Sequence, residues 1–383
     1  MKNQVLLLCL CVAALSSLGL TMLYSTIFTE SDAARFHSQL QWFGAGMLLL
    51  PGCVYLDYGW LQRRPVLYTL AGLCAVLLVA VFIPGLGIRT NGANRWIREV
   101  GQPSEFTKPV VVLLLAAALA RLNSFKIGDL KTGFVQPALF GLVPALLIFA
   151  EPDWGTAILL SLVTLLMLLT AGARWSHLIV TVIVAALLLA ILVTYNPVRW
   201  ERLLVFLDPE AHRRDGGWQI WQSLLAIGSG GWEGHFLDGS LHKFGYVPEQ
   251  QTDFIFARIG EETGLWGSTL VVLLYAGILW CGLQIARQAR ERFGQMIAVG
   301  CTTLMVLQAC INLAVATSLV PNKGLPLPFV SYGGSSLLSM FLCLGLLASI
   351  GWRARAARPV ANGQPGAVQL SLFYPKSGGA AKS

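Results

Sequence analysis

The sequence predicts an all-α membrane protein of about ten transmembrane helices with both termini in the cytoplasm. Three observations support this fold class. The chain of 383 residues is 55% hydrophobic and only 12% charged, and its mean hydropathy is +0.65. Apolar segments close to the roughly 20 residues that span a bilayer recur along almost the whole chain. The alternating pattern of a membrane β-barrel is missing, so a helical bundle is the expected fold.

The expected spans follow one another from the N-terminus. The first begins just after Lys2, and its apolar run continues through Met22 and Tyr24, which is too long for the core of a cleavable signal peptide. We therefore expect a retained first span. In chain order, the ten expected spans are residues 4–27, 39–56, 66–85, 106–121, 134–150, 156–171, 176–194, 265–286, 295–320 and 329–352.

Two of the turns between spans carry polar residues. Spans five and six are joined by a very short turn with Glu151 and Asp153, and spans nine and ten by "VPNKGLPLPFVSYGGSS", which contains Lys323. Its prolines and glycines impose an irregular backbone, and irregular backbone is excluded from contact with lipid. We therefore expect this second turn to be buried in protein or to line a watery cavity. Lys323 is a candidate phosphate contact or an interfacial anchor.

The distribution of basic residues sets the orientation, because cytoplasmic loops are enriched in Lys and Arg. With a cytoplasmic N-terminus, the short outer loops contain only Arg35 and Lys323. The inner loops and termini then hold 15 of the 27 basic residues: Lys2, Arg63, Arg64, Arg121, Lys126, Lys131, Arg174, Arg287, Arg290, Arg292, Arg353, Arg355, Arg358, Lys376 and Lys382.

The other basic residues lie in or beside two outer segments. Long loops escape the orientation rule, so ordinary solvated charge is one interpretation. The other is an outward-facing anionic ligand, such as the phosphate of a lipid carrier, and the concentration in two segments favours it. The residues are Arg89, Arg95, Arg98 and Lys108 after the third span, and Arg199, Arg202, Arg213, Arg214, Lys243 and Arg258 after the seventh.

Residues 195–264 form the only long outer segment. Within it, "GGWQIWQSLLAIGSGG" clusters Trp and apolar residues at a spacing typical of a helix lying at the membrane interface. A stacking site for sugars is the less favoured alternative. In "TDFIFARIGEETG", Thr252 or Asp253 could cap the eighth span while Arg258 and Glu262 form an i,i+4 pair. Alternatively, Asp253 is a partly desolvated general base at the outer membrane edge.

The cysteines and histidines indicate neither a disulfide framework nor a metal centre. All eight cysteines fall inside expected spans, and the five histidines show no metal-ligand spacing. The chain after Arg353 is rich in Gly, Ala, Pro and Lys and lacks periodicity. We therefore expect one membrane domain over residues 1–353 and a disordered cytoplasmic tail over residues 354–383.

Five motifs in this order and topology resemble those of the shape, elongation, division and sporulation (SEDS) family of bacterial cell-wall polymerases. They are "NGANRWI", "GQPSEFTK", "EPDWGTA", "PEQQTDFIFARIGEETG" and "PNKGLPLPFVSYGGSS". The resemblance covers residues 10 to 353, and the "PNKG" turn is closer to the division-type (FtsW-like) branch than to the elongation-type (RodA-like) branch.

The resemblance implies a ten-helix glycosyltransferase that polymerises lipid II outside the cytoplasmic membrane. The family's essential aspartate corresponds to Asp253, which would deprotonate the acceptor GlcNAc 4-hydroxyl. That oxygen would attack the anomeric carbon of the donor strand, with inversion, and expel undecaprenyl pyrophosphate. Lys108 matches the lysine of the family's QPSE-x-x-K stretch, and Gln102 and Glu105 match its neighbours. The outer basic residues, with Arg95, Arg98, Arg258 and Lys323 as candidates, would stabilise the leaving diphosphate.

Three departures from the family pattern concern the site. The spacer between "RWI" and "QPSE" is about three residues shorter than usual. A basic residue that often precedes QPSE in the family therefore has no clear counterpart in this sequence, and Arg98 would have to take its place. Gln251 stands where a histidine is common, so this residue cannot be a required acid. The stretch "EGHFLDGS" is poorer in glycine than expected, which leaves the loop path there open.

The family also implies partners. They are lipid II, the undecaprenyl-pyrophosphate-linked glycan strand, a class B penicillin-binding protein that acts as the transpeptidase, and proteins of the division or elongation machinery. No nucleic-acid partner is expected. A divalent cation, Mg²⁺ or Mn²⁺, is compatible with the chemistry, but no motif here specifies its ligands.

Two other functions compete with polymerisation. A lipid II flippase would carry charged or polar residues deep within its spans and discontinuous helices near the midplane. The expected spans are nearly free of such charges. A non-catalytic scaffold for a transpeptidase could keep the fold, but it would have no need of both Asp253 and Lys108.

Overall fold

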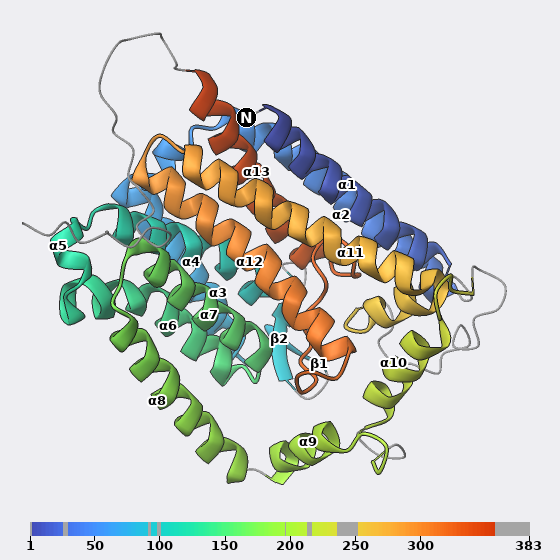
Figure 1. Cartoon of the computed structure of the whole chain (residues 1–383). Helices are drawn as coiled ribbons and strands as arrows, with labels where there is room; N and C mark the ends of the chain where they lie inside the picture. Colours follow the sequence, from blue (N-terminus) through green and yellow to red (C-terminus); the bar gives the residue numbers. More distant parts are fainter. Residues whose placement is uncertain are drawn as a thin grey trace, which may run out of the picture.

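The computed structural model describes residues 2–25, 30–90, 93–97, 101–195, 197–212, 217–235 and 252–356. In these residues the chain is a bundle of long helices (Figure 1). Ten helices coincide in order with the ten predicted spans, which confirms the predicted fold class. They are α1 (Lys2–Tyr24), α2 (Glu30–Tyr55), α3 (Arg64–Ala80), α4 (Pro103–Ala120), α6 (Gln136–Ala150), α7 (Trp154–Ala171), α8 (Trp175–Thr194), α11 (Ile255–Gln288), α12 (Arg292–Ala316) and α13 (Gly334–Ala356).

Eight helices of the described chain are long and apolar enough to cross a membrane. The apolar helix α3, with 17 residues, falls just short in length. Helix α13 runs to Ala356, past the predicted domain boundary at Arg353, and residues 357–383 of the predicted tail lie outside the described residues.

Shorter elements connect the long helices. Between α3 and α4 lies an antiparallel hairpin whose strands pair Gly87 with Ile97 and Ile88 with Trp96. The helix predicted near residue 218 is present as α10, whereas residues 236–251 of the same outer segment lie outside the described residues. The short elements are η1 (Tyr58–Gln62), β1 (Gly87–Thr90), β2 (Ala93–Ile97), α5 (Ser124–Ile127), η2 (Leu130–Val135), α9 (Pro197–Leu207) and α10 (Trp218–Ser229).

The core lies around α4, α12 and α13, which are mostly apolar and buried over much of their length. Such helices are expected in the centre of a membrane bundle. In α13, 83% of the most apolar window is buried, against 6% in α8. Helix α8 accordingly lies at the lower left edge of the molecule, apart from the central helices (Figure 1). The buried helices are therefore the ones that can hold polar side chains away from lipid.

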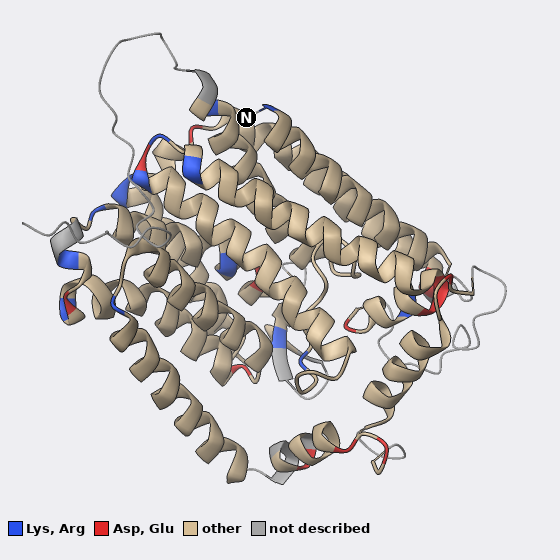
Figure 2. Cartoon of the chain, in the orientation of Figure 1, with Lys and Arg blue, Asp and Glu red and all other residues tan. Residues whose placement is uncertain are grey.

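The basic loops meet at one end of the bundle. Figure 2 shows a group of Lys and Arg segments along the edge that carries the N-terminus, with further ones inside the bundle and at its other end. By the positive-inside rule this end faces the cytoplasm, as the sequence predicts. Four contacts join the loops there: Lys2 Nζ to the Trp352 ring (5.8 Å), Arg121 Nη2 to the Gln62 carbonyl (3.4 Å), Arg292 Nη1 to the Leu122 carbonyl (2.7 Å) and Arg353 Nη2 to the Tyr55 carbonyl (2.9 Å).

Helix α11 is interrupted at Gly264, where φ is 63° and ψ is −156°. Residues 255–263 therefore form a short helix, and the membrane-spanning part begins at Leu265, where the eighth span was predicted to start. A Cβ atom at Gly264 would lie 2.6 Å from the Trp232 carbonyl oxygen, so the segment that follows α10 packs directly on the break. Only glycine fits both the backbone conformation and this close approach.

Candidate functional site

Four segments that are distant in the sequence meet at the end of the bundle opposite the basic loops. They are the turn before α11, the turn between α12 and α13, the N-terminus of α4 and the turn between α6 and α7. Their contacts bring together most of the predicted site residues.

Asp253 lies in the turn before α11 and is half-buried. Its Oδ2 atom is 3.1 Å from the position that a Cβ would take on Gly324, so the carboxylate lies against the backbone of the α12–α13 turn. The alternative that Thr252 or Asp253 caps the helix is wrong, because the N-cap residue is Phe254 and no side chain caps it.

The backbone around Asp253 is held from two sides. Asn312 Nδ2 on α12 donates to the Asp253 carbonyl (2.9 Å), and Ser331 Oγ donates to the Thr252 carbonyl (2.5 Å). Ser331 Oγ also accepts from the Leu327 backbone N–H (2.8 Å). These bonds tie the Asp253 turn to the α12–α13 turn.

The α12–α13 turn is largely buried in protein from Leu325 onward, as its irregular sequence predicts, whereas Leu319 and Gly324 nearer its start are exposed. Leu325 and Leu327 are each 1% exposed. Gln39 on α2 donates from Nε2 to the Ser331 carbonyl (3.2 Å) and accepts from the Gly333 N–H at Oε1 (3.1 Å). The backbone polar groups of the turn thus find side-chain partners inside the bundle. This is the condition for irregular structure at membrane depth.

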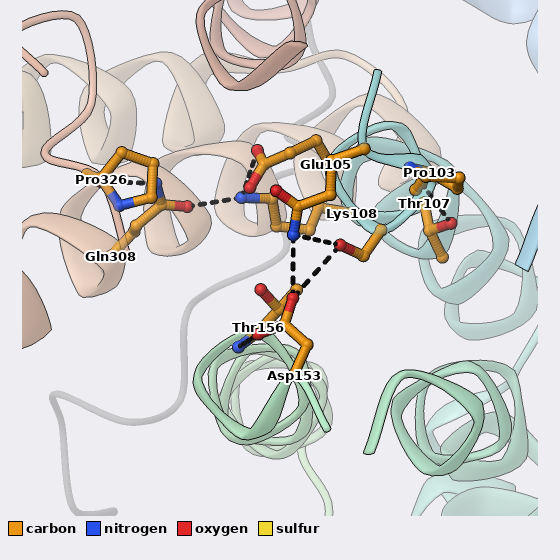
Figure 3. A network of polar contacts seen from close by, with 10 residues as sticks. Pro103, Glu105, Thr107, Lys108, Asp153, Thr156, Gln308 and Pro326 are labelled. Carbon is orange, nitrogen blue, oxygen red and sulfur yellow. Dashed lines mark hydrogen bonds and ion pairs between the residues drawn. The ribbon is translucent and has the colours of Figure 1, made fainter. Parts of the chain in front are cut away.

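Lys108 lies near the start of α4 and is completely buried. Its ammonium is 2.6 Å from Glu105 Oε2 and donates to Gln308 Oε1 at 2.8 Å. Gln308 in turn donates from Nε2 to the Pro326 carbonyl at 2.8 Å (Figure 3). A continuous set of polar contacts therefore runs from Lys108 through α12 to the turn that abuts Asp253.

Asp153, in the α6–α7 turn, joins the same region from the other side (Figure 3). Its Oδ1 accepts from the Thr156 N–H (3.3 Å) and caps α7, while its Oδ2 accepts from Gln102 Nε2 (3.0 Å) and Ser104 Oγ (3.4 Å). Gln102 is the residue just before α4, so these bonds fix the N-terminus of α4 against α7.

Glu151 is buried beside Asp153, and neither of its carboxylate oxygens has a hydrogen-bond partner among the described residues. Burial is the main cause that raises the pKa of the Glu151 carboxyl to about 8. The charge of Asp153 adds to the rise, and Arg95 on β2 opposes it. At neutral pH the Glu151 side chain is therefore largely protonated.

Lys323 lies over the indole of Trp154, with Nζ 5.1 Å from the ring centroid. Trp154 also stacks on Phe149, with centroids 4.5 Å apart. Lys323 directly precedes Gly324, and Gly324 is the residue whose backbone lies against the Asp253 carboxylate.

Arg258 contacts residues outside the segments around Asp253. It is buried, its Nη2 is 2.6 Å from Glu262 Oε1, and it donates to Ser25 Oγ at 3.2 Å. The predicted i,i+4 pair with Glu262 is thus confirmed, and it fastens the short helix before Gly264 to the end of α1. Arg98 and Lys243 lie outside the described residues.

Three residues of this region were not predicted from the sequence: Gln308, Asn312 and Ser331. The available signal was the presence of two amides one helical turn apart in an otherwise apolar span, because polar residues at such positions are costly and mark functional or buried interfaces. Among the described residues, no group of three or more His, Cys, Asp or Glu side chains could hold a metal ion.

Comparison with protein families gives a match over almost the whole chain. A family model described as cell cycle protein, FTSW_RODA_SPOVE, matches residues 5–356. A probable peptidoglycan glycosyltransferase FtsW of Trichlorobacter lovleyi is 37% identical over 355 residues, which cover 90% of this chain and 92% of that protein. Stage V sporulation protein E of Bacillus subtilis is 38% identical over 357 residues, which cover 90% of this chain and 96% of that protein.

Solved structures share the fold. A structure described as the structural coordination of polymerization and crosslinking by a peptidoglycan synthase complex aligns with a TM-score of 0.78 at 27% identity, covering 91% of this chain and 98% of that one. The crystal structure of the rod shape determining protein RodA of Thermus thermophilus aligns with a TM-score of 0.66 at 26% identity, covering 91% and 97%.

Proposed function

Because the chain belongs to the cell cycle protein family of FtsW, RodA and SpoVE, we propose that it polymerises lipid II into peptidoglycan strands with Asp253 as the general base. The reaction takes place at the outer face of the bacterial cytoplasmic membrane, at the end of the bundle opposite the basic loops. The family names and the bundle of apolar helices support an integral membrane glycosyltransferase.

The proposed reaction is an inverting glycosyl transfer. Asp253 accepts the proton of the acceptor GlcNAc 4-hydroxyl as that oxygen forms a bond to the anomeric carbon of the donor strand. The bond between this carbon and the pyrophosphate oxygen breaks, and undecaprenyl pyrophosphate leaves with the electron pair. A positioned base and fixed cations are the two devices that this chemistry needs.

Three described cations are candidates to stabilise the leaving diphosphate: Lys108, Lys323 and Arg95. Lys108 is locked in place by Glu105 and Gln308, so its charge is preorganised rather than mobile. Lys323 adjoins Gly324, which abuts the Asp253 carboxylate. Arg258 is also paired in a buried contact, but its partners Glu262 and Ser25 lie toward α1 and not in the segments around Asp253, which favours a structural role for it.

The observation that carries the proposal is that α4, α12 and the α12–α13 turn are linked to the Asp253 turn. Residues from α4, α12 and two turns are joined by hydrogen bonds that end at the backbone of Asp253 or of the turn against it. A flippase would instead need ionisable groups along a path through the bilayer. Here Lys108 and Glu105 are paired with each other within the first two turns of α4.

The test is lipid II polymerisation by the purified full-length chain in liposomes, read out as labelled glycan polymer. We expect polymer from the native protein and none from Asp253→Asn, because the amide cannot accept the proton. Asp208→Asn is the matched control, since Asp208 is exposed and caps a turn through an oxygen that asparagine retains. Polymer from Asp253→Asn at the native rate would refute the proposed base.

The similarity to this family also suggests a partner that crosslinks the glycan strands. One structural relative belongs to a complex that coordinates polymerization and crosslinking. We propose that this chain likewise works with a class B penicillin-binding protein. Co-purification of the two proteins from detergent-solubilised membranes tests this, and the absence of any transpeptidase in the complex would contradict it.

A further inference from the structure

Two amide side chains on α12, Gln308 and Asn312, connect the proposed cation to the proposed base. We propose that they are positioning residues for the transfer reaction: they fix the Asp253 carboxylate relative to the Lys108 ammonium. This inference rests on the proposed function, and nothing in the family motifs pointed to either residue. Both side chains are buried, at 0% and 1% exposure, and they lie one helical turn apart on the same face of α12.

Asn312 bridges two separate segments with one amino group. Its Nδ2 donates to the Asp253 carbonyl at 2.9 Å and to the Leu325 carbonyl at 2.8 Å, so each of its two N–H bonds holds a different segment. The segments it joins are those that meet where Asp253 Oδ2 approaches Gly324. Asn312, together with the Ser331 bond to the Thr252 carbonyl, thus sets the spacing between the Asp253 backbone and the turn.

Gln308 links Lys108 to the α12–α13 turn, and it uses both the oxygen and the nitrogen of its amide. Oε1 accepts from Lys108 Nζ at 2.8 Å, and Nε2 donates to the Pro326 carbonyl at 2.8 Å. Because Leu325 and Pro326 are consecutive, the two amides hold adjacent carbonyls of the same turn. Through these two side chains, α12 is hydrogen-bonded to Lys108, to the α12–α13 turn and to the Asp253 backbone.

Helix stability does not require these amides. An apolar residue would suit the buried face of a membrane helix better, since an amide there must find partners for its N–H and C=O groups. Here the partners of Gln308 and of the Asn312 amino group lie outside α12, on Lys108 of α4 and on carbonyls of two turns, while Asn312 Oδ1 has no hydrogen-bond partner among the described residues. Displacing a catalytic group by about 1 Å can cost roughly 100-fold in rate. Loss of the Gln308 and Asn312 hydrogen bonds should therefore affect turnover more than substrate binding.

The experiment measures initial rates of polymerisation against lipid II concentration for variants of the full-length chain in liposomes. Asn312→Asp keeps the volume and removes both donors, and it is expected to lower kcat by about 100-fold with KM within about threefold of the native value. Gln308→Met loses both ends of the amide, whereas Gln308→Glu keeps the acceptor for Lys108. We expect the glutamate variant to retain more activity than the methionine variant.

Thr302→Val is the matched control. Thr302 is buried on the same helix, but its hydroxyl donates to Ala298 within α12 and contacts no turn. Its kcat and KM should stay near native values. Thermal melting of each variant is measured alongside, and Asn312→Ala provides a second variant at the key position should Asn312→Asp fail to fold.

The outcomes separate this inference from the proposed function. If Asp253→Asn abolishes polymer while folded Asn312 and Gln308 variants behave like Thr302→Val, the positioning role is wrong and the proposed base stands. Equal losses in kcat and in substrate affinity would also overturn it, because they indicate a generally damaged site. Polymer made by Asp253→Asn would remove the proposed function itself.

Discussion

At the scale of single residues, burial separates the roles of the acidic side chains. Glu151 and Asp153 are two positions apart, yet Asp153 accepts three hydrogen bonds while neither oxygen of Glu151 has one among the described residues. Burial without donors favours the protonated form of Glu151, whereas Asp153 accepts the bonds that hold the N-terminus of α4 against α7. The two acids of one short turn are therefore suited to different tasks.

The raised pKa of Glu151 predicts a pH dependence of stability. In the unfolded chain this carboxyl titrates at the ordinary value of 4.5, and in the folded protein at about 8. Between these pH values the folded state holds a proton that the unfolded state has lost, so stability falls as pH rises to about 8 and is level above it. Glu151→Gln should remove this slope in melting temperatures measured in detergent. Exposed Glu210→Gln is the control, and an unchanged slope in Glu151→Gln would contradict the assignment.

The buried pair of Lys108 and Glu105 makes a second prediction. Lys108→Met removes the cation and leaves the Glu105 carboxylate buried without its partner, which costs about 3–5 kcal/mol in such pairs. Both the melting temperature and the polymerisation rate should fall. The double variant Glu105→Gln with Lys108→Met removes the uncompensated charge, so it should recover stability without recovering activity. Recovery of both would show that Lys108 matters only for folding.

At the scale of elements, the break in α11 decides where Asp253 lies. An uninterrupted helix would carry residues 255–263 straight on from the membrane-spanning part. The positive φ of Gly264, combined with an extended ψ, instead redirects them, and the Arg258–Glu262 pair with Ser25 holds the short helix against α1. The Asp253 turn then reaches the α12–α13 turn.

Gly264→Ala should therefore lower stability and activity together. A Cβ atom there would lie 2.5 Å from the Gly234 backbone N and would strain a backbone with φ of 63°. Gly72→Ala on α3 is the control, because nothing lies within 4 Å of its Cβ position and alanine favours a helix. Melting temperatures and polymer yield measure both effects. A Gly264→Ala variant as stable as Gly72→Ala would show that the break is not required.

At the scale of the whole molecule, charge distribution and site position agree. Lys2, Arg121, Arg292 and Arg353 each contact a neighbouring segment at one end of the bundle, and the polar network of Lys108, Gln308 and Asn312 lies toward the other. The orientation rule makes the first end cytoplasmic, so the proposed site faces outward, where lipid-linked wall precursors are polymerised.

Cysteine labelling tests this orientation. In a background with the native cysteines replaced, Leu319→Cys should react with a membrane-impermeant maleimide in intact spheroplasts. Lys131→Cys should react only after permeabilisation. Both side chains are exposed in the structure, so reactivity reports the side of the membrane rather than burial. The reverse pattern would place the Asp253 end in the cytoplasm and overturn the proposed function.

The sequence by itself determined the ten helices, their order and the end of the bundle at which charge would collect. Hydropathy and the asymmetry of basic loops are local properties, and a span requires only a sufficient apolar length. The motif around Asp253 and the irregular turn with Lys323 could likewise be singled out from residues close together in the chain.

Only the tertiary structure decided which residues touch. The contacts of Lys108 with Gln308, of Asn312 with Asp253 and of Ser331 with Thr252 join positions that are 200, 59 and 79 residues apart. Hydropathy cannot distinguish an amide that contacts a distant turn from one that faces its own helix. The burial that raises the pKa of Glu151 arises in the same way, because desolvation depends on the segments packed around a group rather than on its neighbours in the chain.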